Sequence, residues 1–407
     1  MSFEEQVNTI ERSLGERMVN HALSILRTWL NELGESNPYE QAFSEIRSRY
    51  EGIYKRWLST GDEEGHNADL DAITGDTYRL VDAVYVAMRL HRGVSPHMGT
   101  FNPGSAPSVM HYFAHSVEWK DSDIAWFSDV VNDKNRSSYA LIAVTALSHN
   151  LREVFSEKAV YMLIDGVKAS NAIVAEQCLA NLIITCAHYD VRIDFFPELQ
   201  DDILAVILAT PELSLQSFET LCALVRAAKF NWLEAYAQGE AAFSDLPHEV
   251  QSLLEMTDAK NEMNSFASWI PASESEYLTS IVRILPNTWI FDTIVGDDER
   301  RNTTVSAVLL SVGIMDLVWD KLDQAEGWLL AILRRKSKEP IDLIHLGHCC
   351  LLRGDRLMAL EHYRHARELC KEPRDFLTLF RPERKALVDR GVPLDEIYYI
   401  EDRLLPL

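Results

Sequence analysis

The fold is decided near the C-terminus by residues 340–366, which read PIDLIHLGHCCLLRGDRLMALEHYRHA. Four positions of this stretch match residues that lie 34 places earlier in the chain. The matching pairs are Leu309 and Leu343, Val312 and Leu346, Gly313 and Gly347, and Ala325 and Ala359. A period of 34 residues is typical of repeats built from a helix, a turn and a second helix. The spacing therefore predicts stacked helix pairs.

Residues 306–339 and 340–373 resemble two tetratricopeptide (TPR) repeats. In this family, small residues let the two helices of a pair cross closely, and larger apolar residues fill the space around them. The second copy shows the pattern as Leu343, Leu346, Gly347, Ala359, Tyr363 and Ala366. The first copy shows Leu309, Val312, Gly313, Ala325 and Leu329, with Ile332 in place of the second alanine. The resemblance implies two TPR-like repeats over 304–373, and residues 374–407 are expected to cap their apolar end.

The segment after the repeats, with Phe380-Arg381-Pro382-Glu383-Arg384 and Gly391-Val392-Pro393, looks like the end of uncharacterised bacterial TPR proteins. TPR arrays usually bind peptides in a groove lined by the first helix of each repeat. The positions that would line it here are Leu310, Ile314, Leu317, Ile341, Ile344, His348, Leu351 and Leu352. The lysine, asparagine and arginine that clamp a terminal carboxylate are absent, so that activity is not implied. An apolar groove would not stay exposed. We expect the chain's own helices to fill it, with an apolar partner helix as the alternative.

The middle of the chain, residues 121–257, predicts shorter and strongly apolar helices in pairs. The expected pairs are 123–131 with 139–151, 158–167 with 172–188, and 201–208 with 217–228. The second helices look alike at a drifting spacing, which resembles HEAT or armadillo repeats. A non-repetitive helical bundle is the alternative. The expected fold is therefore an all-α superhelix or solenoid of antiparallel helix pairs, HEAT-like and then TPR-like.

Three further segments complete the expected organisation. Residues 1–92 form an N-terminal helical segment, in which an apolar stripe runs from Phe3 to Trp29 and a second from Tyr39 to Trp57. Ser59 to Asp76 is expected to be a polar, acidic loop before a helix at 77–91. Residues 93–120 form a Gly/Pro-rich connection with a short helix, taken as a domain boundary. Residues 258–303 form an irregular aromatic connector.

Composition restricts the classes of partner. The chain has 407 residues and a net charge of −23, which disfavours binding to nucleic acid. No apolar run is long enough to span a membrane. The N-terminus has neither a basic start nor an apolar signal core, and the 6 cysteines form no CxxC motif, so we expect a reduced, cytoplasmic protein.

The sequence predicts no catalytic residue, no cofactor and no metal site. His111 and His115 lie one helical turn apart but lack a third ligand at a fixed spacing. The histidines and cysteines of 345–370 point to different sides of the repeat. The leading hypothesis is a non-enzymatic scaffold or adaptor that binds a protein or peptide. One alternative is an enzyme with a site near 93–115 that uses His97, His111 or His115, and another is a self-assembling structural subunit. The oligomeric state stays open.

Overall fold

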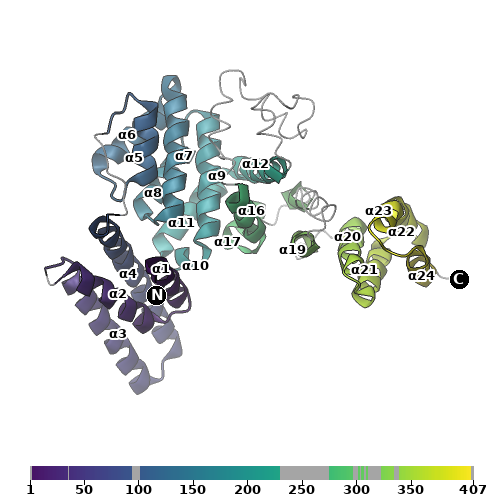
Figure 1. The fold of residues 1–407 in the computed structure, drawn as a ribbon, viewed down its shortest axis with the longest axis horizontal. Coiled ribbons are helices and arrows are strands. Elements are labelled where there is room, and N and C mark those ends of the chain that lie inside the picture. Colours follow the sequence, from purple (N-terminus) through teal and green to yellow (C-terminus); the bar gives the residue numbers. More distant parts are fainter. Residues whose placement is uncertain are drawn as a thin grey trace. The chain divides into compact units, whose positions relative to one another are not determined.

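The computed structural model describes residues 2–34, 36–93, 101–229, 275–296, 301–302, 304–306, 309, 322–333 and 339–404 (Figure 1). These residues fold into helices joined by turns and short connections, and none of them lies in a β-strand. The predicted all-α fold class is confirmed, whereas the solenoid arrangement stays a prediction. The chain divides into two compact units, Met1–Val206 and Ile207–Leu407, which are described separately.

The first unit begins with four helices, α1 (Phe3–Gly15), α2 (Val19–Leu33), α3 (Glu40–Thr60) and α4 (Glu63–His91). The expected stripe from Phe3 to Trp29 belongs to two helices, because the chain turns at Arg17, whose φ of 59° lies in the left-handed region. Helix α4 packs against the other three. Trp29 of α2 is buried among them and its indole nitrogen donates to Gln6 at 2.6 Å.

The expected acidic loop at residues 59–76 is wrong, because most of it is the start of α4. Gly61, with a φ of 67°, ends α3 in the left-handed conformation that glycine adopts easily. Asp62 then caps α4 by accepting from the Gly65 amide at 3.0 Å. The carboxylates on which the expected loop rested form ion pairs with arginines that lie outside α4. These pairs are Asp69 with Arg56, Asp71 with Arg17 and Asp76 with Arg49.

The rest of the first unit contains α5 (Ala106–His115), α6 (Asp121–Asn132), α7 (Ser137–Glu153), α8 (Glu157–Val167) and α9 (Ala172–His188), with a 3₁₀ turn at Lys134–Arg136. Helices α5, α7 and α9 pack side by side, and α6 and α8 pack on one another and on this row (Figure 1). The helices expected at 123–131, 139–151, 158–167 and 172–188 are confirmed. Whether they are HEAT repeats stays a prediction.

Side-chain hydrogen bonds tie the row together. Gln177 of α9 donates to the Thr145 hydroxyl of α7 at 2.7 Å, and Asn171 donates to the Ser137 hydroxyl at 2.8 Å. Asn150 of α7 donates to the Ser116 carbonyl at 2.7 Å, which satisfies a backbone group just after α5. One bond joins the starts of α7 and α9, and another joins the ends of α5 and α7, so together they fix how the three helices are aligned along their length. Residues 93–120, where the sequence predicts a domain boundary, belong to the first unit.

Arg192 joins the two halves of the first unit. It lies on the short helix α10 (Asp190–Ile193), is only 4% exposed, and is followed by α11 (Pro197–Ala209). Its guanidinium donates to Glu11 of α1 at 2.9 Å and forms a second ion pair with Asp82 of α4. It also lies 4.5 Å from the ring centre of Tyr78 and 4.2 Å from that of Phe155. Two carboxylates and two aromatic faces therefore share one buried cation.

The second unit begins with α12 (Pro211–Lys229), which packs against α16 (Ser275–Ile284) and α17 (Trp289–Val295), with a 3₁₀ turn at Leu285–Asn287 between the last two. Of the irregular connector expected at 258–303, the structure describes residues 275–296, which form these short helices, and residues 301–302. Its other residues lie outside the described part. The unit continues with α19 (Leu322–Leu333), which packs on α20 (Pro340–Leu352).

Helices α20 and α21 (Arg356–Leu369) form a tight antiparallel pair. They are followed by α22 (Pro373–Phe380), α23 (Arg384–Asp389) and α24 (Leu394–Leu404), with a 3₁₀ turn at Arg381–Glu383. A Cβ atom at Gly347 would lie 2.4 Å from Cε1 of Tyr363, so the helices cross as closely as the repeat pattern requires. Ala359 and Ala366 are fully buried beside this crossing.

We expect Arg192→Met to lower the free energy of unfolding by about 3 kcal/mol, because it leaves the carboxylates of Glu11 and Asp82 without their shared cation. Urea denaturation followed by tryptophan fluorescence measures the loss. The control, Arg47→Met, removes an exposed pair with Glu51 on the same helix and should cost less than about 0.5 kcal/mol. Equal losses for both variants would contradict the central role of Arg192.

Gly347→Ala should destabilise the second unit by about 2 kcal/mol, although alanine favours helices, because the new methyl group would overlap the Tyr363 ring. Gly327→Ala on α19 is the matched control, since a Cβ there would meet no atom within 4 Å. That change should be neutral or stabilise the unit by up to about 1 kcal/mol. Circular dichroism during urea denaturation distinguishes the two results, and a neutral Gly347→Ala would refute the close crossing.

Candidate functional site

The described part of the predicted groove lies on α20. Ile344, His348 and Leu351 are buried, whereas Ile341 and Leu352 are half-buried. Leu310, Ile314 and Leu317 lie outside the described residues. Ile344 and Leu351 share one apolar cluster with residues of the C-terminal helices. Those residues are Phe376, Leu377, Phe380, Leu387, Val392, Ile397, Ile400 and Leu404. The chain's own helices therefore cover this half of the groove, and its use by a partner stays a prediction.

His348 is a buried polar residue that contacts two members of this cluster, Tyr363 and Phe380. Its Nδ1 lies 2.8 Å from the Tyr363 hydroxyl, and its ring centre lies 5.6 Å from that of Phe380. Phe380 stacks on Phe376 of the same helix at 5.4 Å. The Nε2 atom of His348 has no hydrogen-bond partner among the described residues. Burial lowers the pKa of His348 well below its ordinary value, and burial lowers the pKa of His345 to about 4. Both imidazoles are therefore neutral at pH 7.

The other chemically active side chains of the repeat do not converge with His348. Burial raises the pKa of Cys349 to about 12, so its thiol is protonated and unreactive at pH 7. His362 is half-buried on α21 and His365 is exposed. Within the described ranges, no group of three or more His, Cys, Asp or Glu side chains is arranged to hold a metal ion.

The region of the alternative enzyme hypothesis is only partly described, and His97 lies outside it. The rings of His111 and His115 on α5 are 5.0 Å apart, and His149 of α7 lies 6.4 Å from His115. Burial lowers the pKa of His115, helped by the neighbouring histidines and by Arg89 of α4. This arrangement disfavours a protonated imidazole at neutral pH. The enzyme hypothesis stays an untested prediction.

A surface that the sequence reading missed lies where α3 turns into α4. Tyr54 is 46% exposed and Leu58 is 71% exposed, both on the last turns of α3. Tyr54 contacts Trp57 at 5.5 Å between ring centres, and Trp57 stacks at 4.9 Å on His66 of α4. We call Tyr50, Tyr54, Trp57, Leu58 and His66 the hairpin-end cluster. Tyr54 and Leu58 are four residues apart, on the flank of the buried stripe, and this spacing was the available signal.

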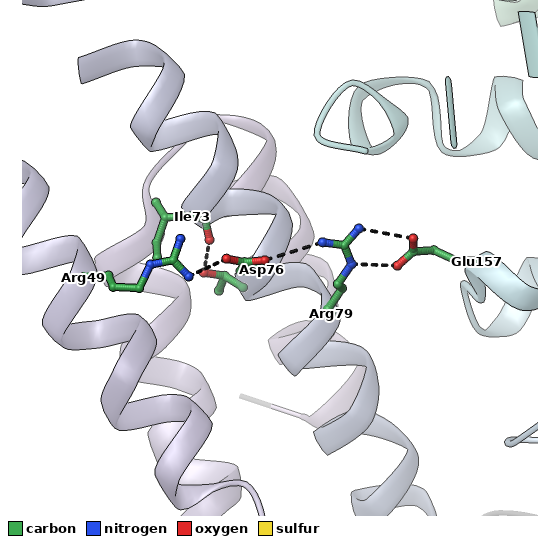
Figure 2. A network of polar contacts seen from close by, with 6 residues as sticks. Arg49, Ile73, Asp76, Arg79 and Glu157 are labelled. Carbon is green, nitrogen blue, oxygen red and sulfur yellow. Dashed lines mark hydrogen bonds and ion pairs between the residues drawn. The ribbon is translucent and has the colours of Figure 1, made fainter. Parts of the chain in front are cut away.

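A chain of ion pairs holds this hairpin to the rest of the first unit, as Figure 2 shows. Arg49 of α3 contacts Asp76 of α4 at 2.6 Å, and Asp76 contacts Arg79 at 3.5 Å. Arg79 in turn pairs with Glu157 at the start of α8 at 2.9 Å. These ion pairs link α3 and α4, the helix pair that carries the hairpin-end cluster, to the start of α8.

Comparisons of the chain with protein-family models, with curated proteins and with solved structures find no match. The resemblance to TPR and HEAT repeats therefore rests on the residues alone. Over the part of the chain that the structure describes, no helix combines the length and the apolar character needed to cross a membrane.

Tyr363→Phe should lower the free energy of unfolding of the second unit by about 1–2 kcal/mol, since it leaves the buried Nδ1 of His348 unpaired. Thermal and urea denaturation measure the change at pH 7.5. Tyr398→Phe is the control, because the Tyr398 side chain lies on the surface of α24 and is 49% exposed. Indistinguishable stabilities for the two variants would show that the buried hydrogen bond contributes nothing.

Proposed function

We propose that the protein is a non-enzymatic scaffold or adaptor that binds another protein. The observation that carries the proposal is the hairpin-end cluster, in which tyrosine, tryptophan and leucine side chains gather at the end of a helix pair that ion pairs hold in place. Tyrosine and tryptophan are enriched among the residues that dominate binding energy at protein interfaces. Their rigid rings bury a large area at a small cost in conformational entropy.

The proposed partner is a protein segment with aliphatic or aromatic side chains. The net charge of −23 favours encounter with a neutral or basic segment over nucleic acid. The predicted groove on the TPR-like repeats is a second proposed surface. An apolar helix could occupy its described half only by replacing α22, whose Phe376 and Phe380 lie four residues apart on the covering face.

We further propose a cytoplasmic location. All six cysteines are free thiols, and five of them are buried. This supports a reducing compartment, in which structural disulfides are rare. The other alternative from the sequence is self-assembly. Light scattering tests it, because an assembly of the purified protein would have a multiple of the chain's own mass of 46.4 kDa.

Affinity purification of the full chain from its native cells tests the proposal when it is paired with surface variants. Tyr54→Ala combined with Leu58→Ala should reduce the recovery of a specific partner at least tenfold, because each change removes exposed contact area without opening the core. Tyr398→Ala with Leu394→Ala is the matched control, since these side chains are similarly exposed on α24. A partner recovered equally with all three proteins would refute binding at the hairpin end. A chain that recovers no specific partner would refute the scaffold.

A further inference from the structure

His348 lies at the junction of three helices. It belongs to α20, shares a hydrogen bond with Tyr363 of α21, and contacts Phe380 of α22. Its side chain is buried, with 2% of the residue exposed. His345 lies one turn earlier on α20, with its ring centre 5.8 Å from that of His348. The helices α22, α23 and α24, which we call the C-terminal cap, therefore dock over the imidazole of His348, and the second buried imidazole, that of His345, lies beside it.

We propose that His348 and His345 form a proton-operated latch, which holds the C-terminal cap on α20 while both rings are neutral and releases the cap when they are protonated. This inference concerns the second unit alone and does not rest on the proposed scaffold function. The proposal rests on the position of the pair. A positive charge on His348 would lie at the contact between α20 and the cap, whose covering face is apolar at Phe376 and Phe380.

The groups around the pair would not neutralise an imidazolium. On α20 itself lie the thiols of Cys349 and Cys350, and on α21 lies the Tyr363 hydroxyl. Arg390, which follows α23 in the cap, adds a positive charge that disfavours protonation of His348. Three carboxylates lie near this region. Asp342, one turn before His345 on α20, is buried and accepts a hydrogen bond from the Glu339 amide at 3.2 Å. Burial raises the pKa of Asp342 to about 6, so this carboxyl group also becomes neutral as the pH falls and does not supply a fixed negative charge. The other two carboxylates are already paired.

These two carboxylates are Glu326 of α19, which contacts Arg353 at 2.5 Å, and Glu396 of α24, which pairs with Arg356. Protonation of the histidines would therefore place one or two uncompensated charges under the cap. Water can solvate these charges only if the cap separates from α20.

The sign of the pH dependence follows from the direction of the pKa shifts. Burial lowers both histidine pKa values in the docked state, for His345 to about 4, whereas an exposed histidine titrates near its ordinary value of about 6.5. The docked cap is therefore fully stable above pH 6.5 and loses stability as the pH falls from 6.5 towards 4. Each histidine contributes up to about a tenfold change in the opening equilibrium per pH unit.

Hydrogen–deuterium exchange of the full chain, followed by mass spectrometry and corrected for intrinsic exchange, tests the latch. Between pH 7.5 and 5.5, the opening equilibrium of residues 373–404 should rise at least tenfold in the wild type. Helix α7 of the first unit serves as the internal reference and should change less than threefold. An unchanged cap, or an equal change in α7, would overturn the proposal.

The decisive variant is His345→Gln combined with His348→Gln, which keeps polar side chains but removes both titrating groups. Its cap should open less than threefold more at pH 5.5 than at pH 7.5, whereas His365→Gln, at an exposed position of α21, should behave like the wild type. If the double variant does not fold, His345→Gln alone must reduce the pH-dependent rise by at least threefold. A rise of wild-type size in either variant would refute the latch.

Discussion

The first unit depends on the burial of one cation. Arg192 forms ion pairs with two carboxylates of helices near the N-terminus and lies between two aromatic rings, one from α4 and one from the connection between α7 and α8. A guanidinium can serve all of these groups at once, because it is planar and carries five donors. Its desolvation is costly, so the arrangement is favourable only when every partner is in place. The burial of Arg192 therefore makes helices α1–α4 and the helices that follow them in the first unit depend on each other for their stability.

The second unit also buries a polar side chain, but there the buried group is a neutral imidazole, that of His348. A histidine is buried under the C-terminal helices, where a hydroxyl satisfies one ring nitrogen and aromatic rings surround the remainder. Glycine at the nearest position of the same helix allows the tyrosine that supplies this hydroxyl to approach. The close helix crossing and the buried polar contact thus depend on each other. The repeat pattern of small residues explains the crossing, and the cap contributes Phe380, which lies against the histidine that makes the polar contact.

Much of the helical organisation could be predicted from sequence because it is encoded locally. The helix at 172–188 follows from its apolar run and matches α9 in full. The loop predicted for the acidic stretch after Ser59 is wrong, although Gly61 and Asp62 are ordinary helix-end residues, because arginines that are distant in the chain pair with its carboxylates. Arg192 could not have been identified, since its partners lie 181 and 110 residues away. Exposure of Tyr54 likewise depends on which neighbouring helix covers α3, which periodicity alone does not determine.

Helix α4 is a long helix that joins the hairpin-end cluster to the ion pair with Arg192. Its 29 residues span about 44 Å at 1.5 Å per residue, with the hairpin end at one extremity. Asp82, which pairs with Arg192, lies nearer the other end of the helix. The part of α4 between this contact and the hairpin end is therefore longer than the part on its other side. A rotation of α4 by about 5° about its contact with Arg192 moves the hairpin end by about 2–3 Å and the opposite end by about 1 Å. If α4 turned as a rigid rod about this contact, a displacement of the hairpin end would therefore also displace Asp82 relative to Arg192.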